Sequence, residues 1–241
     1  MYLSVIVPAY NEEKRLSKTL FNIDAYLKQQ NYEYEIIAVD DGSTDTTVSL
    51  VKDLQPHMRN LQVIENKINH GKGYVTRQGL LAATGEYRLF TDADSSTSIE
   101  QIEKFLPELK NYDIVIASRR LPGAVLDPPQ TFLRTLDSKI FKLMLNTTVF
   151  LPGIRDTQCG FKLLSAKATQ DILSQCHING WVFDVEILKL SRKMGYKIKE
   201  LPVVWKNDVV SHVRYSQFFH ILFDLVRIRW NLWMNVYGLK K

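Results

Sequence analysis

The sequence predicts an α/β fold in which helices flank a mostly parallel β-sheet. Through residues 1–120, short apolar runs rich in Val and Ile alternate with segments of helical periodicity, the pattern of a parallel sheet with right-handed crossovers. Polar clusters follow four of these runs, at the strand ends where such sheets bind ligands. The chain has 241 residues, of which 45% are hydrophobic and 24% charged. This composition suits one α/β domain with an elaborated C-terminal half.

Five buried strands are expected in the first half of the chain. Each is a short continuous apolar run, as expected for a strand covered on both faces. The predicted strands are 3–9, 35–41, 61–65, 87–91 and 113–118. Helices are expected between them, the first from an N-cap at Asn11 to about Gln29, the second from Ser43 or Thr44 to about Leu54, and the third over 71–83.

The second half of the chain is less regular. A proline-containing loop is expected over 121–129, helices over 131–146 and 181–194, and an extended strand over 197–205. The last stretch, 216–237, is aromatic and has a helical pattern. We therefore expect a main domain over 1–215 and an amphipathic C-terminal helix within 216–241.

Charge and cysteine content narrow the partners and the compartment. The net charge of +5 suits phosphate-bearing partners or an anionic membrane surface, and we find no clustered basic stripe for nucleic acid. Two cysteines without metal-type spacing or a disulfide framework favour a reducing compartment. Neither a signal-peptide pattern nor an uncharged run long enough to span a membrane is found. We expect a cytoplasmic protein that is peripheral on the membrane.

Two carboxylates at the end of one predicted strand form the first candidate site. Asp92 and Asp94 follow the strand 87–91. Because strand side chains alternate, both point to the same side and Ala93 points away. Neighbouring carboxylates repel each other unless a positive group lies between them, and a hard divalent cation bound to phosphate oxygens fits. The alternative is an acidic turn that caps a helix beginning near Ser98.

Two further clusters suit a nucleotide. Asp40 and Asp41 end a predicted strand, where carboxylates can accept hydrogen bonds from a ribose hydroxyl or a base imide. Helix capping through Asp41 and Ser43 is the alternative. Lys72 lies between two glycines at a helix start, which offers backbone N–H groups and an ammonium to a phosphate or a nucleotide edge. The spacing is not that of a Walker loop, so P-loop ATP chemistry is not expected.

Four motifs, taken together and in order, resemble those of family 2 inverting glycosyltransferases, which have the GT-A fold. They are VPAYNE at 7–12, VDDGSTD at 39–45, NHGKG at 69–73 and TDAD at 91–94. The motifs SR at 118–119 and DTQCGFK at 156–162 are similar to the polyprenyl-phosphate branch, which includes dolichyl-phosphate glucosyltransferases and, nearby, dolichyl-phosphate mannose synthases. The resemblance extends over residues 3–215.

The resemblance implies roles for the matching positions. The base and ribose of the nucleotide would be held by Pro8, Tyr10, Glu12, Asp40 and Asp41. Lys72 would lie near the same nucleotide, and Asp92 by the ribose and the metal. Asp94 would ligate Mg²⁺ or Mn²⁺ bridging the diphosphate. Ser96 stands where relatives often carry Gln and would ligate the metal through its hydroxyl, or a water would replace it.

A second set of residues would hold an acceptor phosphate and the charges near the metal. The resemblance assigns this role to Arg119, Arg134 and Ser138, and Arg214 near the C-terminus would add a phosphate contact. Arg134 and Ser138 are spaced i, i+4, so a helix puts them on one face. The alternative for Arg134 is a surface salt bridge.

A phosphate acceptor removes the need for a strong catalytic base. The second pKa of a phosphate monoester lies near 6, so a lipid phosphate is mostly dianionic at neutral pH and is already a nucleophile. In-line attack at the anomeric carbon would invert its configuration, while the metal and the arginines stabilise the leaving diphosphate. For a sugar hydroxyl acceptor, Asp156 would be the candidate base, and a loop-capping role is its alternative.

The expected function is inverting transfer of one sugar, glucose from UDP-glucose, to polyprenyl or dolichyl phosphate at the cytoplasmic membrane face. The enzyme alternatives are GDP-mannose as the donor and a glycan hydroxyl as the acceptor. Two other classes are a nucleotidyltransferase and a non-catalytic nucleotide-sugar-binding homologue. The intact pair of Asp92 and Asp94 argues against the non-catalytic homologue.

The C-terminal helix fits a lipid substrate. A polar stripe recurs at intervals of three and four residues, at His220, Asp224, Arg227, Asn231 and Asn235. Apolar residues, tryptophans among them, occupy most of the remaining positions, a composition typical of helices at a membrane interface. The alternative is a helix packed on the domain or on a second subunit of a homo-oligomer.

Overall fold

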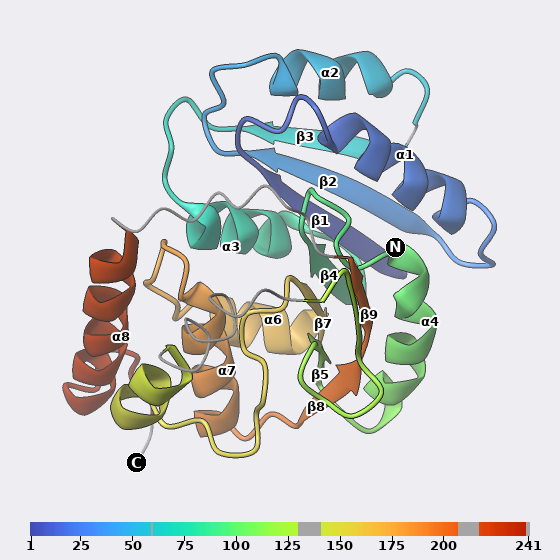
Figure 1. The fold of residues 1–241 in the computed structure, drawn as a ribbon. Coiled ribbons are helices and arrows are strands. Elements are labelled where there is room, and N and C mark those ends of the chain that lie inside the picture. The colour runs from blue at the N-terminus through green and yellow to red at the C-terminus, as the bar shows by residue number, and fades with distance from the viewer. Residues whose placement is uncertain (59, 130–140, 207–216, 240–241) are drawn as a thin grey trace.

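The computed structural model describes residues 1–58, 60–129, 141–206 and 217–239, except for the side chains of residues 217 and 218. These residues form a seven-stranded sheet in the order β3-β2-β1-β4-β7-β5-β8 (Figure 1). Its strands are β1 (Leu3–Ala9), β2 (Tyr34–Asp40), β3 (Leu61–Glu65), β4 (Tyr87–Thr91), β5 (Ile114–Ser118), β7 (Phe161–Ser165) and β8 (Ile198–Pro202). All pairs are parallel except those of β7 with β4 and β5. The predicted α/β fold with a mostly parallel sheet is confirmed.

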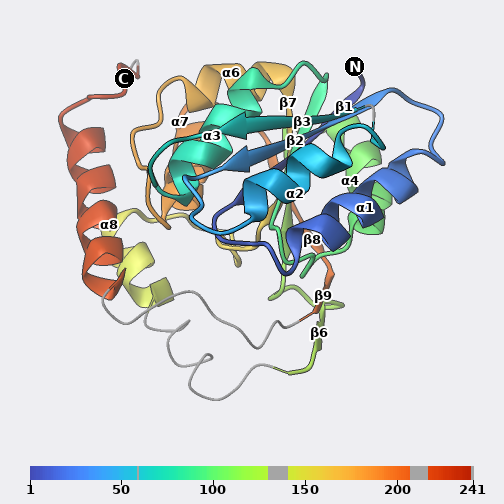
Figure 2. The same ribbon diagram turned by 90° about the horizontal axis from the view of Figure 1, so that it is seen from above.

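Helices cover both faces of the sheet and bury two hydrophobic cores (Figures 1 and 2). One core joins Val5 of β1 to helices α1 (Leu16–Leu27), α2 (Thr47–Leu54) and α4 (Ile102–Phe105). The other joins Ile6 to α3 (Lys72–Ala82), α6 (Ala166–Leu173), α7 (Phe183–Lys193) and α8 (Gln217–Trp233). Successive strand residues face opposite sides, and every residue of β1 and β2 is buried. The continuous apolar runs in the sequence therefore reflect burial on both faces.

The five strands predicted in the first half are confirmed to within one residue, but two predicted helix starts are wrong. α1 begins at Leu16, because Asn11 adopts a φ of 54° and its Oδ1 accepts the backbone N–H of Thr44 at 2.9 Å. α2 begins at Thr47, and Ser43 Oγ instead accepts the N–H of Asn11 at 2.9 Å. The polar residues after β1 and β2 therefore join the two loops and do not cap helices.

β7 is a strand that the sequence pattern does not predict, and it lies inside the sheet between β4 and β5. Leu163 is paired with Leu89 on one side and with Val115 on the other. Because β7 runs antiparallel to both neighbours, its beginning lies at their carboxyl ends. The loop 156–160 that precedes it therefore reaches the same rim of the sheet as the residues that follow β4 and β5.

The second half otherwise follows the expected outline. The predicted helix 181–194 is α7, and the predicted strand 197–205 is β8 together with β9 (Val204–Lys206). β9 pairs with β6 (Val125–Asp127), so part of the predicted loop 121–129 is a strand. Short 3-10 helices, η1 (Ile99–Gln101) and η2 (Leu106–Lys110), flank α4.

Two predictions fall partly outside the described residues. Residues 141–148 are helical. Most of the predicted helix 131–146 lies outside the described residues, and so does the predicted domain boundary at residue 215. No helix among the described residues is long and apolar enough to cross a membrane.

Candidate active site

The predicted nucleotide-binding residues lie where the parallel strands β1 and β2 end side by side. Pro8 is buried within β1, and Tyr10, just beyond it, is 45% exposed. The carboxylate of Glu12 pairs with Arg15, with 2.6 Å between Oε1 and Nη2. The rim therefore presents an exposed aromatic ring and a paired carboxylate beside the buried strand end.

Asp40 and Asp41 hold the loops of this rim together. Asp41 accepts two backbone N–H groups, that of His70 at 2.7 Å and that of Gly71 at 3.0 Å. Burial raises the pKa of Asp41, and these two hydrogen bonds oppose the rise. Asp40 Oδ2 accepts the N–H groups two and three residues ahead, both at 3.0 Å. Asp40 Oδ1 is buried and has no hydrogen-bond partner among the described residues.

Lys72 and Asp92 form an ion pair next to this rim. The distance between Lys72 Nζ and Asp92 Oδ1 is 2.6 Å, and both side chains are 27% exposed. Burial acts to lower the pKa of Lys72, but the attraction of Asp92 outweighs it and raises that pKa. The predicted nucleotide lysine and the first carboxylate of the TDAD motif are thus brought together.

Asp94 lies beyond Asp92 in a turn that offers unused oxygen atoms. Ser96 donates its backbone N–H to Asp94 Oδ1 at 2.9 Å. Ser96 Oγ is buried without a partner among the described residues. Burial, and after it the charge of Asp92, raises the pKa of Asp94. The next helical turn begins only at η1, and its N-cap, Ser98, makes no side-chain capping bond, so these carboxylates do not cap it.

The donor set of this turn fits a hard cation. Carboxylate and hydroxyl oxygens are the ligands that Mg²⁺ and Mn²⁺ prefer, and a cation would relieve the repulsion between Asp92 and Asp94 while using the unpaired hydroxyl of Ser96. Among the described residues, no group of three or more His, Cys, Asp or Glu side chains is placed to hold a metal by itself. A cation here would therefore depend on oxygen atoms of a bound ligand for much of its coordination.

Arg119 and Asp156 form a buried ion pair at the end of β5. Arg119 Nε and Nη2 donate to the two oxygens of Asp156 at 2.7 and 2.9 Å, and the backbone N–H of Arg119 adds a third bond at 3.0 Å. Burial acts to raise the pKa of Asp156, but the hydrogen bonds and charge of Arg119 lower it to about 2. Glu200 accepts the backbone N–H of Asp156 at 2.9 Å, so this carboxylate is held ionised and fixed in place.

A second buried ion pair, between Lys162 and Asp184, has no role in the sequence prediction. Lys162 is 1% exposed, and its Nζ lies 2.6 Å from Asp184 Oδ1. The same Nζ donates to the carbonyl of Cys159 at 2.7 Å. Burial raises the pKa of Asp184, and Lys162 opposes the rise. The available signal was a lysine inside the apolar strand FKLLS, which needs a carboxylate partner if buried.

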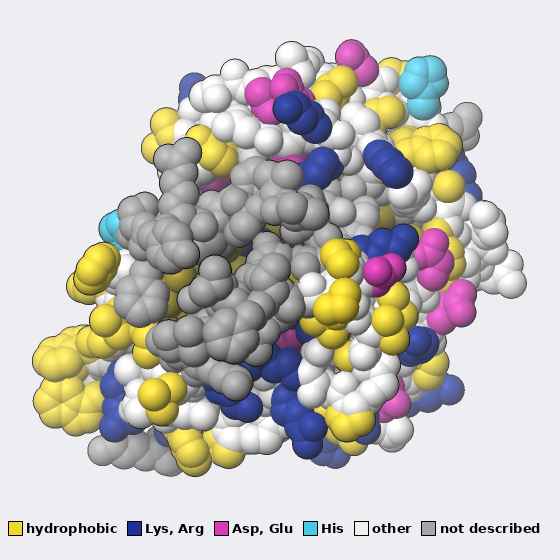
Figure 3. All heavy atoms as spheres, viewed as in Figure 1, with side chains coloured by type: hydrophobic (Ala, Val, Ile, Leu, Met, Phe, Trp, Pro, Cys, Tyr) yellow, Lys and Arg dark blue, Asp and Glu magenta, His cyan; other side chains and the backbone are white. Residues whose placement is uncertain are grey.

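The residues of the predicted polar stripe of α8 are divided between the two sides of the helix, because His220, Arg227 and Asn235 are exposed. Asn231 is buried and Asp224 is half-buried, because the helix packs inward through Leu225 and Ile228, which are fully buried. Apolar residues also line the opposite, exposed face, seen along the left edge of Figure 3. This exposed face consists of Phe219, Phe223, Val226, Trp230 and Trp233. One face of the helix thus packs on the domain, which was the alternative, while contact of the exposed face with a membrane or a second subunit stays a prediction.

Three predicted acceptor residues, Arg134, Ser138 and Arg214, lie outside the described residues. The other predicted site residues lie on the rim formed by the ends of β1, β2, β4 and β5 and by the loop 156–160.

Comparison with known proteins gives a family. Residues 4–173 match the glycosyl transferase family 2 model. The dolichyl-phosphate β-glucosyltransferase of Dictyostelium discoideum is 36% identical over 255 residues, which cover 100% of this chain and 77% of that protein. The enzyme of the same name from Saccharomyces cerevisiae is 32% identical, with 85% and 67% covered.

Solved structures support the fold. Glucosyl-3-phosphoglycerate synthase from Mycobacterium tuberculosis, in complex with Mn²⁺, UDP and phosphoglyceric acid, matches with a TM-score of 0.69 at 15% identity and covers 100% of this chain and 80% of that one. S. aureus TarS 1–349 matches with a TM-score of 0.61 at 21% identity, with 96% and 66% covered. These likenesses confirm the predicted GT-A fold. The chain belongs to glycosyl transferase family 2.

Proposed function

We propose that this glycosyltransferase transfers glucose from UDP-glucose to the phosphate of a polyprenyl or dolichyl lipid, with inversion at the anomeric carbon. The observation that carries the proposal is the similarity to dolichyl-phosphate β-glucosyltransferases across 100% of the chain. The β configuration in their name is the result expected when an α-linked nucleotide sugar reacts by a single in-line displacement.

The donor would bind along the rim between β1, β2 and β4. Pro8 and Tyr10 would contact the base, and the unpartnered Asp40 Oδ1 would accept a hydrogen bond from the base imide or a ribose hydroxyl. Asp41 would act through the backbone of His70 and Gly71, which it fixes. Lys72, at the first residue of α3, would meet the diphosphate where the helix N-terminus also favours an anion.

Asp94, Ser96 and Asp92 would hold Mg²⁺ or Mn²⁺ together with the diphosphate oxygens. When bound, the cation would stabilise negative charge on the departing UDP. Lys72 would orient Asp92 through its 2.6 Å contact. The protein itself would thus contribute the two carboxylates of Asp92 and Asp94, held close together, and would form no covalent bond to the sugar.

The state of Asp156 favours a phosphate acceptor over a glycan hydroxyl. A hydroxyl acceptor needs a general base with a pKa near the working pH, whereas the pKa of Asp156 is lowered to about 2 and Arg119 occupies both of its oxygens. A lipid phosphate is already ionised and needs no base. Arg119 and Asp156 would then serve as a rigid wall of the acceptor side.

The exposed apolar face of α8 would contact the membrane surface that carries the lipid acceptor. Trp230 and Trp233 are 56% and 72% exposed, and Arg227 and Arg229 are exposed beside them. Tryptophan with flanking arginine suits the boundary between headgroups and acyl chains. The alternative is that a second copy of the chain docks on the same face. Vesicle binding measured together with the oligomeric state distinguishes the two.

The test is a turnover assay on the purified chain with Mg²⁺ or Mn²⁺, a short polyprenyl phosphate and labelled UDP-glucose or GDP-mannose in parallel. Label that enters the organic phase from UDP-glucose is the expected result. Transfer from GDP-mannose alone would show that the donor is GDP-mannose and not UDP-glucose. Transfer to a polyprenol or a glycan, but not to the phosphate, would overturn the proposed acceptor.

A further inference from the structure

We propose, on the basis of the function above, that Glu186 and Tyr237 are positioning residues for Lys72, the lysine expected at the donor diphosphate. Glu186 lies in α7 and Tyr237 follows α8. Both act through the loop 176–182, which connects α6 to α7 and lies between α8 and the start of α3 (Figure 1). The segment that follows α8 would thus help to prepare the donor site.

The loop 176–182 packs directly on the glycines that flank Lys72. Gly73 donates its backbone N–H to the carbonyl of Asn179 at 2.8 Å, and Arg77, one turn further along α3, donates to Asn179 Oδ1 at 2.9 Å. A Cβ atom at Gly71 would come within 2.5 Å of the Asn179 carbonyl oxygen. The two glycines therefore let the loop contact the backbone on both sides of Lys72.

Trp181 of this loop contacts the lysine side chain itself. The Nζ atom of Lys72 lies 5.5 Å from the centre of the Trp181 ring, within the range of a cation–π interaction. The same Nζ atom lies 2.6 Å from Asp92 Oδ1. The ammonium is therefore held by a carboxylate of the donor rim and by an aromatic ring of the loop. A displaced loop would leave it less well placed for a diphosphate.

Glu186 fixes the first part of the loop. Its side chain is fully buried, and both of its oxygens accept the backbone N–H of His177 at 3.0 Å. Glu186 Oε2 also accepts the N–H of Ile178 at 2.9 Å. A buried carboxylate must be hydrogen-bonded, and bonds from backbone N–H groups to a charged oxygen are stronger than neutral ones. Glu186 thus sets the conformation of the two residues directly before Asn179.

Tyr237 joins this carboxylate to the segment after α8. Its hydroxyl donates to Glu186 Oε1 at 2.8 Å, and its ring stacks on that of His177 with 5.6 Å between the ring centres. α8 also contacts the loop through Asp224, because a Cβ atom at Gly180 would come within 2.6 Å of Asp224 Oδ2. The helix whose outer face is exposed and apolar is therefore packed on the loop that holds Lys72.

The consequence for the reaction concerns the donor. An ammonium that is already in place stabilises a diphosphate without a cost of reorganisation, both when the donor is bound and when charge develops on the departing UDP. Loosening the loop 176–182 should therefore weaken binding of the nucleotide diphosphate and raise the KM for UDP-glucose.

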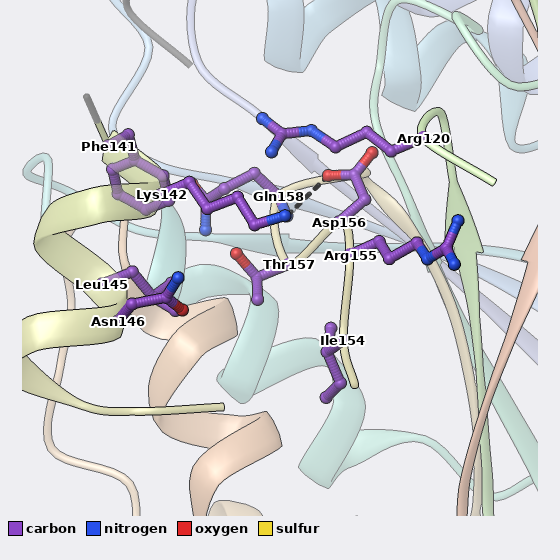
Figure 4. A pocket seen from close by; sticks show the side chains of 10 residues that line it. All are labelled: Arg120, Phe141, Lys142, Leu145, Asn146, Ile154, Arg155, Asp156, Thr157 and Gln158. Atoms are coloured by element: carbon purple, nitrogen blue, oxygen red, sulfur yellow. Dashed lines mark hydrogen bonds between the residues drawn. The ribbon is translucent and has the colours of Figure 1, made fainter. Parts of the chain in front are cut away.

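The acceptor side gives an internal control. Asp156 and Gln158 lie in the loop before β7, where the backbone N–H of Gln158 donates to Asp156 Oδ1 at 3.2 Å (Figure 4). Asp156 is held by Arg119, at the end of β5, and by Glu200 of β8, and neither belongs to α7 or α8. The KM for the lipid phosphate should therefore stay unchanged when the loop 176–182 is loosened.

The test uses Tyr237→Phe, which removes one hydroxyl and keeps the ring against His177. Calorimetric titration with UDP in the presence of Mg²⁺ should show a Kd raised about three- to tenfold. Tyr34→Phe is the matched control, because the hydroxyl of Tyr34 likewise donates to a buried carboxylate, that of Asp24, at 2.7 Å, in the other hydrophobic core. Both variants should lower the thermal midpoint, whereas only Tyr237→Phe should raise the Kd for UDP. An unchanged Kd in Tyr237→Phe, or an equal rise in Tyr34→Phe, would overturn the proposal.

A second measurement shows whether Tyr237 acts through Lys72. Lys72→Met removes the ammonium, so adding Tyr237→Phe to it should raise the Kd for UDP no further, although the thermal midpoint should fall as before. Glu186→Gln in the chain that keeps Lys72 should weaken UDP binding by about tenfold, and Trp181→Phe should retain more affinity than Trp181→Leu. Additive losses of affinity in the double variant would contradict a positioning role.

Nucleotide binding separates this inference from the proposed function, because it needs no acceptor. If no lipid phosphate accepts sugar but the titrations show this pattern, the function fails and the positioning role of Glu186 and Tyr237 stands. If the wild-type chain binds GDP in place of UDP, the same pattern is expected with GDP, since Lys72 would meet the diphosphate that both share. Sugar transfer with a wild-type KM for UDP-glucose in both variants would leave the function intact and overturn the positioning role.

Discussion

Gly160 lies directly against the carboxylate of Asp92. A Cβ atom at Gly160 would come within 1.9 Å of Asp92 Oδ2, so any side chain here would displace the carboxylate. The unpredicted strand β7 creates this contact, because it brings the loop 156–160 to the end of β4. The position of Asp92, the first acidic residue of the site, thus depends on the absence of a side chain at Gly160 in the loop before β7.

Gly160→Ala should therefore lower kcat about 100-fold, because Asp92 must move and its contact with Lys72 is lost. The thermal midpoint of unfolding should change little, since the added methyl group meets the partly exposed side chain of Asp92. Steady-state kinetics and a thermal melt check this, with Asp92→Asn as the comparison. Wild-type kcat in Gly160→Ala would contradict the assigned role of Asp92.

Asp94→Asn should weaken Mn²⁺ binding in the presence of UDP and lower metal-dependent turnover by 100-fold or more, because a neutral amide is a poor partner for a hard cation. Calorimetric titration with Mn²⁺ measures the first effect. Asp53→Asn, an exposed carboxylate on α2, is the control. Full Mn²⁺ affinity in Asp94→Asn would remove this residue from the metal site.

Lys162→Met should destabilise the fold by about 3–5 kcal/mol, because it leaves Asp184 buried without its partner. The double variant Lys162→Met with Asp184→Asn should recover part of this loss, since no buried charge then remains unpaired. Urea unfolding measures both free energies. A single variant as stable as the wild type would show that the pair is not coupled.

The ion pair of Arg119 and Asp156 should make the free energy of unfolding depend on pH in the acid range. The pKa of Asp156 is about 2 in the folded chain, below its usual 3.8. The pair therefore stabilises the folded state by about 2 kcal/mol at pH values above the pKa of Asp156 in the unfolded chain. This stabilisation is lost as the pH falls from about 5 to 2. Unfolding measured across this range should show a shallower loss in Asp156→Asn than in the wild type. Parallel curves would contradict the assigned pKa.

Replacing Trp230 and Trp233 by Ser should weaken binding to vesicles that contain anionic lipid by about tenfold or more, because both rings belong to the exposed face of α8. Phe21→Ser, at a 61% exposed aromatic on α1, is the control. Vesicle flotation checks the loss. Unchanged flotation, together with loss of a dimer in sedimentation, would assign this face to a second copy.

The sequence predicts what depends on local pattern. The five strands of the first half are apolar runs. The TDAD motif directly follows one of them, so the local sequence alone places Asp92 and Asp94 at a strand end. The resemblance to family 2 assigns Lys72 and Asp92 separately to the same nucleotide, and the direct contact between them is a finding of the structure.

Features that depend on distant partners are not predictable in this way. β7 is five residues long and is a strand because β4 and β5 pair with it from both sides. The roles of Asn11 and Asp41 in joining loops need the neighbouring loop to be in place. The orientation of α8 is not fixed by its sequence because both of its faces carry apolar residues, and only packing of Leu225 and Ile228 selects the inner one.

The central claim is that the acceptor atom is a phosphate oxygen of a lipid. The most direct test is product analysis after incubation with UDP-glucose, Mg²⁺ and an equal mixture of a polyprenyl phosphate and its polyprenol, by mass spectrometry with assignment of the anomeric linkage by NMR. We predict a single hexose on the phosphate in the β configuration and none on the alcohol. Glucose on the alcohol, or an α-linked phosphate product, would contradict the account.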